Sequence, residues 1–505
     1  MDFSIKEIAE ACEGRLFLRN GIKEDTCVTS VVIDSRKVEA GGVFLATVGE
    51  RVDGHSFISR VYEAGAVLAV TQKTPEQAEA DTGKDCSRWG SYLLVEDTLQ
   101  ALKDIAGAYR EKAGIPVVGI TGSVGKTSTK EFIAGVLSEK YRVLKTEGNY
   151  NNEIGVPLTL LRIRPEHELA VVEMGISDFG EMHRLSKMAR PNVCVITNIG
   201  QCHLENLKTR DGILKAKSEI FDFMAEDGEI CLNGEDDKLR TLTEIKGRKP
   251  RFFGLGGNPA EEVRAGKIVS HGLWGSDAVL EFSPAGHGAA GEEALRTDST
   301  DSAEVGAENV PERLQIHVPL PGAHMVLNAA AAACVARLFG LSAGEIAAGL
   351  EKIRPVSGRN NLIPLKNYTL IDDCYNANPA SMRAAIDLLT LADTAKVAIL
   401  GDMFELGENS DALHAGVGEY AAAAGIDTIL CVGENAANIF EAAAERAEGG
   451  KYIALFPTVE ALLTALEQER EQYIPNGSTV LIKASHGMEF IKILEFLKGC
   501  GADGR

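Results

Sequence analysis

A buried apolar run that leads straight into a glycine-rich turn constrains this chain more than any other feature. Residues 115–120 are apolar and predict a buried strand, and a helix is predicted from Lys126 to about Ser138. At the start of such a helix, the backbone N–H groups and the helix dipole favour the binding of an anion such as phosphate. A lysine there neutralises the outer phosphates, and a threonine hydroxyl can hold Mg²⁺. The residues expected to bind phosphate are Gly122, Ser123, Gly125, Lys126, Thr127 and Ser128.

The loop departs from the full P-loop pattern, because Ile120 stands where that pattern has its first glycine. The alternative is an ordinary strand–turn–helix junction with a surface lysine. Gly-Lys-Thr at the junction of strand and helix is the arrangement that phosphate binding requires, so the sequence favours a phosphate site.

Charge and composition exclude two broad classes of function. The net charge of −21 argues against general binding to nucleic acid or to an anionic membrane. No apolar run approaches about 20 residues, so no membrane span is predicted. The ten cysteines are scattered without a Cys-x-x-Cys pair, and the first residues do not resemble a signal peptide. We therefore expect a reducing, cytoplasmic setting.

The order of predicted elements indicates an α/β protein of three domains, as the length of 505 residues suggests. The first, 1–105, begins with a helix at 5–12 and has strands at 31–36 and 42–46. The second, 106–354, alternates strands and helices as a parallel, doubly wound sheet does. Residues 285–312 are rich in Gly, Ala, Ser and acids, and we expect a flexible insertion there.

The third predicted domain, 355–505, has a second alternating pattern. We expect strands at 369–373, 397–401, 428–432, 452–456 and 479–483, and helices at 380–392, 411–424, 436–447, 459–469 and 489–497. This pattern resembles a Rossmann-type domain without a clear Gly-x-Gly-x-x-Gly fingerprint, so a nicotinamide dehydrogenase is poorly supported.

Polar residues follow several predicted strands of the second domain. Glu173 ends a strand expected beside the loop strand, His203 follows a further strand, and Lys217 lies on a later helix. A carboxylate at this sheet edge can bind Mg²⁺, and a histidine can ligate a second metal. A carbamylated Lys217 would offer a further carboxylate. Taken singly, His203 is as well explained by packing and Lys217 by a solvated helix surface.

Six other residues carry candidate roles. Ser35 and Arg36 could hold a ligand's phosphate or sugar, and the alternative is a turn with a local ion pair. The Asn-rich stretch around Asn149 and Asn152 is typical of a substrate-facing loop, or of an ordinary turn. Arg359 could reach a γ-phosphate, and Asp373 could position Arg359 or Lys126 or hold a ribose; a lone acid at a strand end is otherwise a turn former.

Together these motifs resemble the Mur ligase family. The similar stretches are the loop at 119–128, Glu173-Met174-Gly175, Thr197–Gly200 with His203, Ala216-Lys217, Gly322-x-His324-x-x-x-Asn328, Arg359, and 372–379. They span all three predicted domains in order. The N-terminal segments 34–36 and 53–55 are similar to the family's uridine-nucleotide domain.

Two stretches, 375–382 and 400–407, resemble the branch of the family that adds D-alanyl-D-alanine. The Asp-Asn-Pro-Arg stretch usual in the branch that adds a single amino acid to the UDP-muramoyl-dipeptide is absent, although that branch is the nearest alternative. One departure is Lys483-Ala484-Ser485-His486-Gly487, where the family more often has Lys-Gly-Ser-Arg.

The resemblance implies an ATP-dependent amide ligase. The carboxylate of UDP-N-acetylmuramoyl-tripeptide would become an acyl phosphate, which the amine of D-alanyl-D-alanine attacks. In the family's pattern Lys126, Glu173, His203 and Lys217 are catalytic, and Thr127, Glu173, His203 and carbamylated Lys217 hold Mg²⁺. His324 and Asn328 would contact the adenine side, and Arg359 and Asp373 would complete the site on domain closure. Candidate substrate contacts are Ser35, Arg36, Asn149, Asn152, Asn376 and Asn378.

Three other functions remain as alternatives at this point. A folylpolyglutamate synthase leaves the Asp34-Ser35-Arg36 domain unexplained. A P-loop regulator that hydrolyses ATP without ligation has no use for the motifs at 322–328 and 373–379. A pure UDP-sugar-binding protein has no use for Lys126-Thr127. We expect the chain to act as a monomer.

Overall fold

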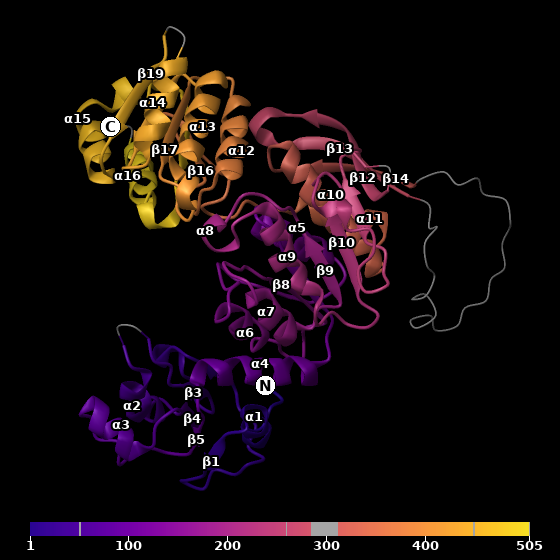
Figure 1. Cartoon of the computed structure of the whole chain (residues 1–505), viewed down its shortest axis with the longest axis vertical. Helices are drawn as coiled ribbons and strands as arrows, with labels where there is room; N and C mark the ends of the chain where they lie inside the picture. The colour runs from indigo at the N-terminus through magenta and orange to yellow at the C-terminus, as the bar shows by residue number, and fades with distance from the viewer. Residues whose placement is uncertain (50–51, 259, 284–311, 448–449, 504–505) are drawn as a thin grey trace, which may run out of the picture.

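The computed structural model describes residues 1–49, 52–258, 260–283, 312–447 and 450–503, arranged around three β-sheets (Figure 1). The expected insertion at 285–312 lies outside the described residues except for Glu312, which begins a strand. The α/β class expected from the sequence is confirmed.

The first sheet has the order β1-β5-β4-β3-β2 and is parallel except for β1. The strand predicted at 31–36 is shorter, because residues after Val32 turn into a short 3₁₀ segment, Ser35–Lys37, capped by Asp34. The strand predicted at 42–46 is one residue shorter at each end. The elements are α1 (Ile5–Cys12), β1 (Arg15–Phe17), β2 (Val31–Val32), β3 (Val43–Leu45), α2 (Ile58–Glu63), β4 (Leu68–Thr71), α3 (Pro75–Thr82) and β5 (Tyr92–Leu94).

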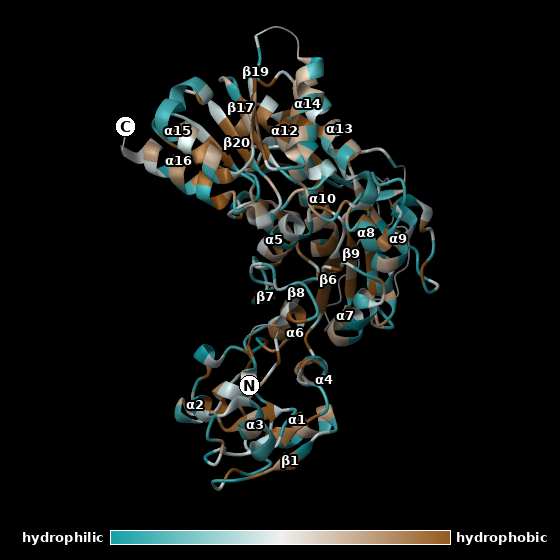
Figure 2. Ribbon diagram, turned by 60° about the vertical axis from the view of Figure 1, so that its left-hand side comes forward, coloured by the Kyte–Doolittle hydropathy of each residue, from teal (hydrophilic) through white to brown (hydrophobic). Residues whose placement is uncertain are grey.

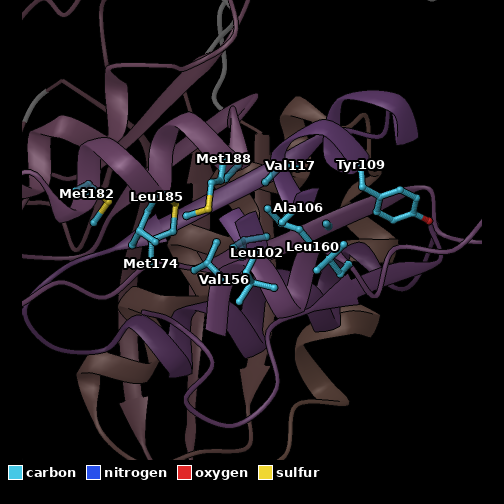
Figure 3. Close-up of a cluster of buried hydrophobic side chains, with 14 of the residues drawn as sticks. Leu102, Ala106, Tyr109, Val117, Val156, Leu160, Met174, Met182, Leu185 and Met188 are labelled. Atoms are coloured by element: carbon cyan, nitrogen blue, oxygen red, sulfur yellow. The ribbon is translucent and has the colours of Figure 1, made fainter. Parts of the chain in front are cut away.

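Helix α4 (Thr98–Ala113) connects the first sheet to the second unit and spans the boundary expected at residue 105. Asp97 caps its start, and Gly114, with φ of 67°, ends it. Leu102 and Ala106 of α4 pack into the same buried cluster as Val156 and Met188 (Figure 3). The helix therefore belongs to the packing of both units.

The central sheet has the order β14-β13-β12-β11-β10-β9-β6-β8-β7. Strands β7 and β8 lie on one side of β6, and the chain then crosses to β9 on the other side, so the strand order reverses at β6. In such sheets, ligands usually bind at the carboxyl end of the strands where the order reverses. The elements to β11 are β6 (Val117–Thr121), α5 (Lys126–Leu137), β7 (Val143–Lys145), α6 (Gly155–Leu160), β8 (Leu169–Glu173), α7 (Glu181–Ala189), β9 (Val193–Ile196), α8 (Leu204–Leu207), α9 (Arg210–Ser218), β10 (Glu229–Asn233) and β11 (Arg251–Gly254).

The far edge of this sheet adds an antiparallel extension that the sequence did not predict. Strands β12 (Glu261–Ser270), β13 (Ser276–Phe282) and β14 (Glu312–Val318) pair antiparallel to one another, and β12 runs parallel to β11. Helices α10 (Ala323–Leu338) and α11 (Ala343–Glu351) follow. The pattern of β12 is weak because its second half, 267–270, is exposed on both faces.

The third sheet has the order β15-β16-β20-β17-β18-β19 and is parallel except for β15. Helices α12, α13 and α14 cover one face and α15 and α16 the other (Figure 2), as a Rossmann-like domain requires. The elements are β15 (Asn361–Pro364), β16 (Thr369–Asp372), α12 (Pro379–Thr390), β17 (Lys396–Gly401), α13 (Ser410–Ala423), β18 (Thr428–Val432), α14 (Ala436–Arg446), β19 (Tyr452–Phe456), α15 (Val459–Tyr473), β20 (Thr479–Lys483) and α16 (Ile491–Asp503).

Strands β18, β19 and β20 begin and end at the predicted residues, and the five predicted helices occur with shifted ends. Strand β15 was not predicted, since Pro364 and the short run 361–364 weaken its pattern. Among the described residues, no helix has both the length and the apolar character that crossing a membrane requires.

Candidate active site

A cavity of about 640 Å³ opens at the carboxyl end of β6 and is lined by residues of both the central and the C-terminal sheets. Its lining includes most of the residues expected to bind nucleotide. The sequence-predicted residues in the lining are Ser123, Gly125, Lys126, Ser128, Asn152, Glu173, His203, His324, Asn328, Arg359, Asp373, Asn376 and Asn378.

The loop between β6 and α5 is fastened to the segment that follows β9. Gly122 has φ of 150°, and a Cβ there would lie 1.9 Å from Thr197 Oγ1, so only glycine fits. The Ser123 backbone N–H donates to Asn198 O at 3.0 Å, and the Val124 N–H donates to Asn198 Oδ1 at 2.9 Å. The position of the loop is therefore fixed by the neighbouring strand.

Lys126 begins α5, and its Nζ donates to the carbonyl of Gly122 at 2.8 Å. It forms no carboxylate ion pair in the parts of the chain that the structure describes. Burial lowers the pKa of Lys126, and the negative charge of Glu173 opposes that shift. An uncompensated ammonium group at a helix start is suited to an anionic ligand.

Glu173 ends β8, beside β6 in the sheet, and is 1% exposed. Its Oε2 accepts a hydrogen bond from Thr127 Oγ1 at 2.8 Å, and its Oε1 accepts one from Asn151 Nδ2 at 2.8 Å. Lys130 Nζ lies 3.8 Å from the same carboxylate. A hydroxyl and a carboxylate in contact, both oxygen ligands, are a donor set that suits Mg²⁺.

His203 and Lys217 approach the same region from α8 and α9. Nδ1 of His203 lies 2.6 Å from Glu405 Oε2 of the C-terminal unit, although the contact lacks hydrogen-bond geometry. Burial lowers the pKa of His203; the Glu405 carboxylate opposes the shift, and the charges of Lys217 and Lys126 add to it.

Lys217 is 1% exposed, and within the described ranges its side chain has no hydrogen bond or ion pair. Burial, with a smaller contribution from the charge of Lys126, lowers its pKa to about 8. A partly neutral amine is the form that reacts with CO₂, so this environment suits a carbamate. The solvated surface lysine that the sequence also allowed is not what the structure contains.

The start of α10 supplies the other wall of the cavity. Asn328 Oδ1 accepts a hydrogen bond from Thr129 Oγ1 of α5 at 2.9 Å, which joins the two helices. His324 Nε2 lies 3.3 Å from Asn360 Nδ2 of the segment leading to β15. Burial lowers the pKa of His324, so the ring is neutral at neutral pH.

The C-terminal unit contributes a buried ion pair and a stacked arginine. Lys483 Nζ lies 2.6 Å from Asp373 Oδ2 and donates to Asn376 O at 3.0 Å. Burial raises the pKa of Asp373, and the charge of Lys483 opposes that effect. The Arg359 guanidinium lies 4.2 Å from the centre of the Tyr375 ring, a cation–π arrangement.

Some predicted residues lie elsewhere or have other partners. Asn152 Oδ1 accepts from the Gly155 N–H at 2.9 Å, in the turn before α6, and Asn378 Oδ1 accepts from the Ser381 N–H at 2.9 Å and caps α12, although both residues line the cavity. Asn149 is exposed, and Arg36 pairs with Asp34 at 2.8 Å. Residues outside the cavity lining are Gly122, Thr127, Lys217, Asn149, Ser35 and Arg36.

Sequence reasoning did not single out several residues that the cavity contains. Asn151, not Asn149 or Asn152, contacts Glu173. Lys483 stood next to the noted departure at Ser485-His486, and its place at the end of a strand was the available signal. Tyr375 lies within the motif at 372–379, but its contact with Arg359 is tertiary. Asn360 carries no such signal, because its contact with His324 depends on how the two units are placed.

A nucleotide-type loop that faces a second α/β domain across a shared cavity defines a class of multidomain ligases, and family models identify which one. The Mur ligase middle domain matches residues 120–336, the glutamate ligase domain matches 358–486, and the Mur ligase family catalytic domain matches 28–110. The chain belongs to the Mur ligase family. The expected class, an ATP-dependent amide ligase, is confirmed.

Curated relatives are similar over nearly the whole length. The UDP-N-acetylmuramoyl-tripeptide–D-alanyl-D-alanine ligase of Bacillus subtilis (strain 168) is 33% identical, and the alignment covers 98% of each chain. The enzyme of the same name from Escherichia coli (strain K12) is 33% identical over 94% of this chain and 95% of its own. The D-alanyl-D-alanine branch expected from the sequence is confirmed, and the single-amino-acid alternative is not favoured.

Solved structures have the same three-domain fold. MurF from Acinetobacter baumannii is 31% identical, with a TM-score of 0.80 over 98% of this chain and 99% of that one. MurF from Thermotoga maritima in complex with ADP is 28% identical, with a TM-score of 0.73 over 94% of this chain and 99% of that one.

Proposed function

We propose that this chain joins D-alanyl-D-alanine to UDP-N-acetylmuramoyl-tripeptide at the expense of ATP, releasing ADP and phosphate and supplying a pentapeptide precursor for peptidoglycan. The observation that carries the proposal is the two-sided cavity. One wall holds Lys126 at the start of α5, which has no carboxylate ion pair among the described residues, and the other holds Arg359 and the Asp373–Lys483 pair. The names of the relatives support the choice of substrates.

The proposed chemistry follows from the charges in the cavity. A substrate carboxylate that attacks the γ-phosphate of ATP must approach a polyanion, so cations have to neutralise both partners. Lys126 at the start of α5 would supply this neutralising charge. The backbone around the phosphates would be shaped by Gly122, Ser123, Gly125 and Ser128. The resulting acyl phosphate is attacked by the amine of D-alanyl-D-alanine, and the tetrahedral intermediate expels phosphate.

We further propose that Mg²⁺ is held by Thr127 and Glu173, and by His203 with a carbamylated Lys217. The contact between the Thr127 hydroxyl and the Glu173 carboxylate at 2.8 Å, and the burial of Lys217 without a carboxylate partner in the described ranges, support these assignments. Bound Mg²⁺ supplies neutralising charge to the phosphates.

The remaining predicted residues have proposed roles in binding. His324 and Asn328 would contact the adenine side, and Arg359 and Asp373 would close over the phosphates when the C-terminal domain approaches. Ser35 and Arg36 would bind the uridine nucleotide. The amides proposed as substrate contacts are Asn149, Asn152, Asn376 and Asn378.

We also propose the division into a UDP-substrate domain (1–105), an ATP domain (106–354) and a ligase domain (355–505), and a monomer in the cytoplasm. All ten cysteines are free thiols, which is consistent with a reducing compartment. Light scattering during size-exclusion chromatography tests the monomer, since a dimer would have twice the mass of 54.0 kDa.

The direct test is ADP release with ATP, Mg²⁺ and UDP-muramoyl-tripeptide, with D-alanyl-D-alanine, free D-alanine or no acceptor added. The proposal predicts turnover with the dipeptide only and a pentapeptide product by mass spectrometry. Turnover with a single amino acid on a UDP-dipeptide would contradict it, as would ADP release that needs no acceptor. Lys126→Ala serves as the inactive control for contaminating ATPases.

A further inference from the structure

A second group of metal-ligating side chains lies outside the cavity, on the antiparallel extension of the central sheet. His271, Asp277 and His317 place one ligand atom each within 4.8 Å of the others. His271 Nε2 lies 2.8 Å from Asp277 Oδ2, and His317 Nδ1 lies 2.7 Å from Asp277 Oδ1. We propose that this cluster, the His271 cluster, binds a divalent transition-metal ion such as Zn²⁺.

The backbone holds the three side chains on one surface. Asp277 and His317 are directly opposite each other on β13 and β14. Residues opposite on antiparallel strands place their side chains on the same face. His271 is brought over them by a tight turn, in which its N–H donates to Gly275 O at 2.9 Å and Gly272 and Gly275 have φ of 63° and 110°. Little rearrangement is then needed to bring the ligands together.

The donor set favours a borderline transition metal. Zinc takes two imidazoles and one carboxylate at about 2.0–2.2 Å, and an open fourth position is filled by water. Tetrahedral bonds of that length separate ligand atoms by about 3.4 Å, so shifts of under about 1 Å would suffice from the present spacing. Imidazole ligands disfavour Mg²⁺ and Ca²⁺, which prefer oxygen. The proposed Mg²⁺ of the cavity would therefore not compete well here.

The cluster is also accessible from solution. Between 42% and 53% of each of the three side chains is exposed, so an ion in solution can reach them.

The turn that carries His271 also contacts the C-terminal unit. Leu273 packs against the apolar cluster under α12, and a Cβ on Gly272 would lie 3.3 Å from Leu391 O. The hairpin end lies beside α12 in Figure 1. A bound metal that fixes His271 would hold this turn, and so would stabilise the contact between the central and C-terminal units.

The test measures binding of Zn²⁺ alone to the full chain by equilibrium dialysis, without nucleotide. Cys27→Ser is used as the background because Cys27 is the exposed cysteine and would bind zinc itself. The variants are His317→Gln and Asp277→Asn, with His271→Asn as a replacement if one fails to fold. His183→Gln is the matched control, since His183 lies 2.6 Å from Asp222 in an exposed pair that has no third ligand in the part of the chain that the structure describes.

We expect each cluster variant to bind one zinc equivalent fewer than the background, and His183→Gln to bind as the background does. The proposal would be overturned if all chains bound the same number of zinc ions, or if the Cys27→Ser chain showed no saturable zinc binding. The cluster would then be only a hydrogen-bonded His–Asp–His group. These outcomes are independent of ligase activity.

A second readout uses the tryptophans. Of the two in the chain, Trp89 is buried and Trp274 is 67% exposed beside the cluster. In a Trp89→Phe chain, we expect Co²⁺ to quench Trp274 fluorescence saturably and His317→Gln to abolish that quenching. Quenching of equal size in His317→Gln would contradict binding at the cluster.

Discussion

The two walls of the cavity differ in whether their lysines have a carboxylate partner. In the C-terminal wall, the charge of Lys483 is neutralised by Asp373 at 2.6 Å, and Arg359 lies against the Tyr375 ring. In the central wall, Lys126 has no carboxylate ion pair among the described residues, nor has Lys217, which lies outside the cavity lining, and burial lowers the pKa of both. An unneutralised buried cation costs stability and persists where a ligand supplies the counter-charge. We propose from this difference that the central wall binds the phosphates and that the C-terminal wall positions them.

The largest effect is expected from Lys217→Ala, which removes the proposed carbamate. We expect turnover to fall roughly 10³-fold, because the charge stabilising the transferring phosphate is lost. Short carboxylic acids should restore part of the activity by occupying the space left by the side chain. The measurement is ADP release with and without added acid, at a fixed ATP concentration.

Lys215→Ala on the same helix is the control, because Lys215 is exposed, and its turnover should be unchanged. A carbamate should also give a ¹³C resonance with labelled bicarbonate that is missing in Lys217→Ala. Full activity of Lys217→Ala would contradict the role of this lysine, and absence of both rescue and resonance would contradict the carbamate.

A smaller effect, on the free energy of unfolding, is expected when the buried Lys483–Asp373 ion pair is removed. Lys483→Met leaves Asp373 buried without a counter-charge, so the C-terminal domain should lose about 3–5 kcal/mol. The double variant Lys483→Met, Asp373→Asn should recover much of that loss, because no buried charge remains. Urea unfolding followed by circular dichroism measures both. A double variant less stable than Lys483→Met would show that the pair is not the source of the loss.

The N-terminal unit offers a pH-dependent contrast with the cavity. Burial of the Asp53 carboxylate acts to raise its pKa, but hydrogen bonds from Lys73 and His55 outweigh burial and lower the pKa to about 2. A folded pKa below the unfolded value of 3.8 gives stability that is present above pH 3.8 and lost as pH falls toward about 2. Burial also lowers the pKa of His55, which adds a loss as pH falls below 6.5.

We expect the Asp53 contribution to be about 1 kcal/mol, after allowing for solvent screening at this partly exposed carboxylate. Unfolding of this unit can be followed by the fluorescence of buried Trp89 in a Trp274→Phe chain. Asp53→Asn should remove the step below pH 4 and leave the histidine step. Identical pH profiles for the two chains would contradict the assignment.

The smallest effect on stability is expected at Arg36, whose side chain is 80% exposed. Arg36→Ala should leave the melting temperature unchanged and raise KM for the UDP substrate several-fold without altering KM for D-alanyl-D-alanine. Arg60→Ala, a second exposed arginine of the same unit, is the control. A lowered melting temperature with normal KM would mean that Arg36 has only a structural role.

Local patterns were sufficient for much of this structure. Val117–Thr121 and the helix from Lys126 were predictable because an apolar run, a glycine turn and Gly-Lys-Thr follow one another. Strand β12 was missed because its exposed half shows no apolar alternation. Local sequence could not decide which of Asn149, Asn151 and Asn152 faces Glu173, nor that Glu405 lies beside His203, since both contacts depend on tertiary placement.

Lys126 is proposed to supply charge to the phosphates and not to the rest of the nucleotide. Isothermal titration of adenosine, ADP and a non-hydrolysable ATP analogue into the native chain and Lys126→Ala tests this role most directly. We expect the native chain to gain affinity with each phosphate, and Lys126→Ala to bind adenosine as before but to lose most of that gain. An unchanged gain in Lys126→Ala would contradict the claim.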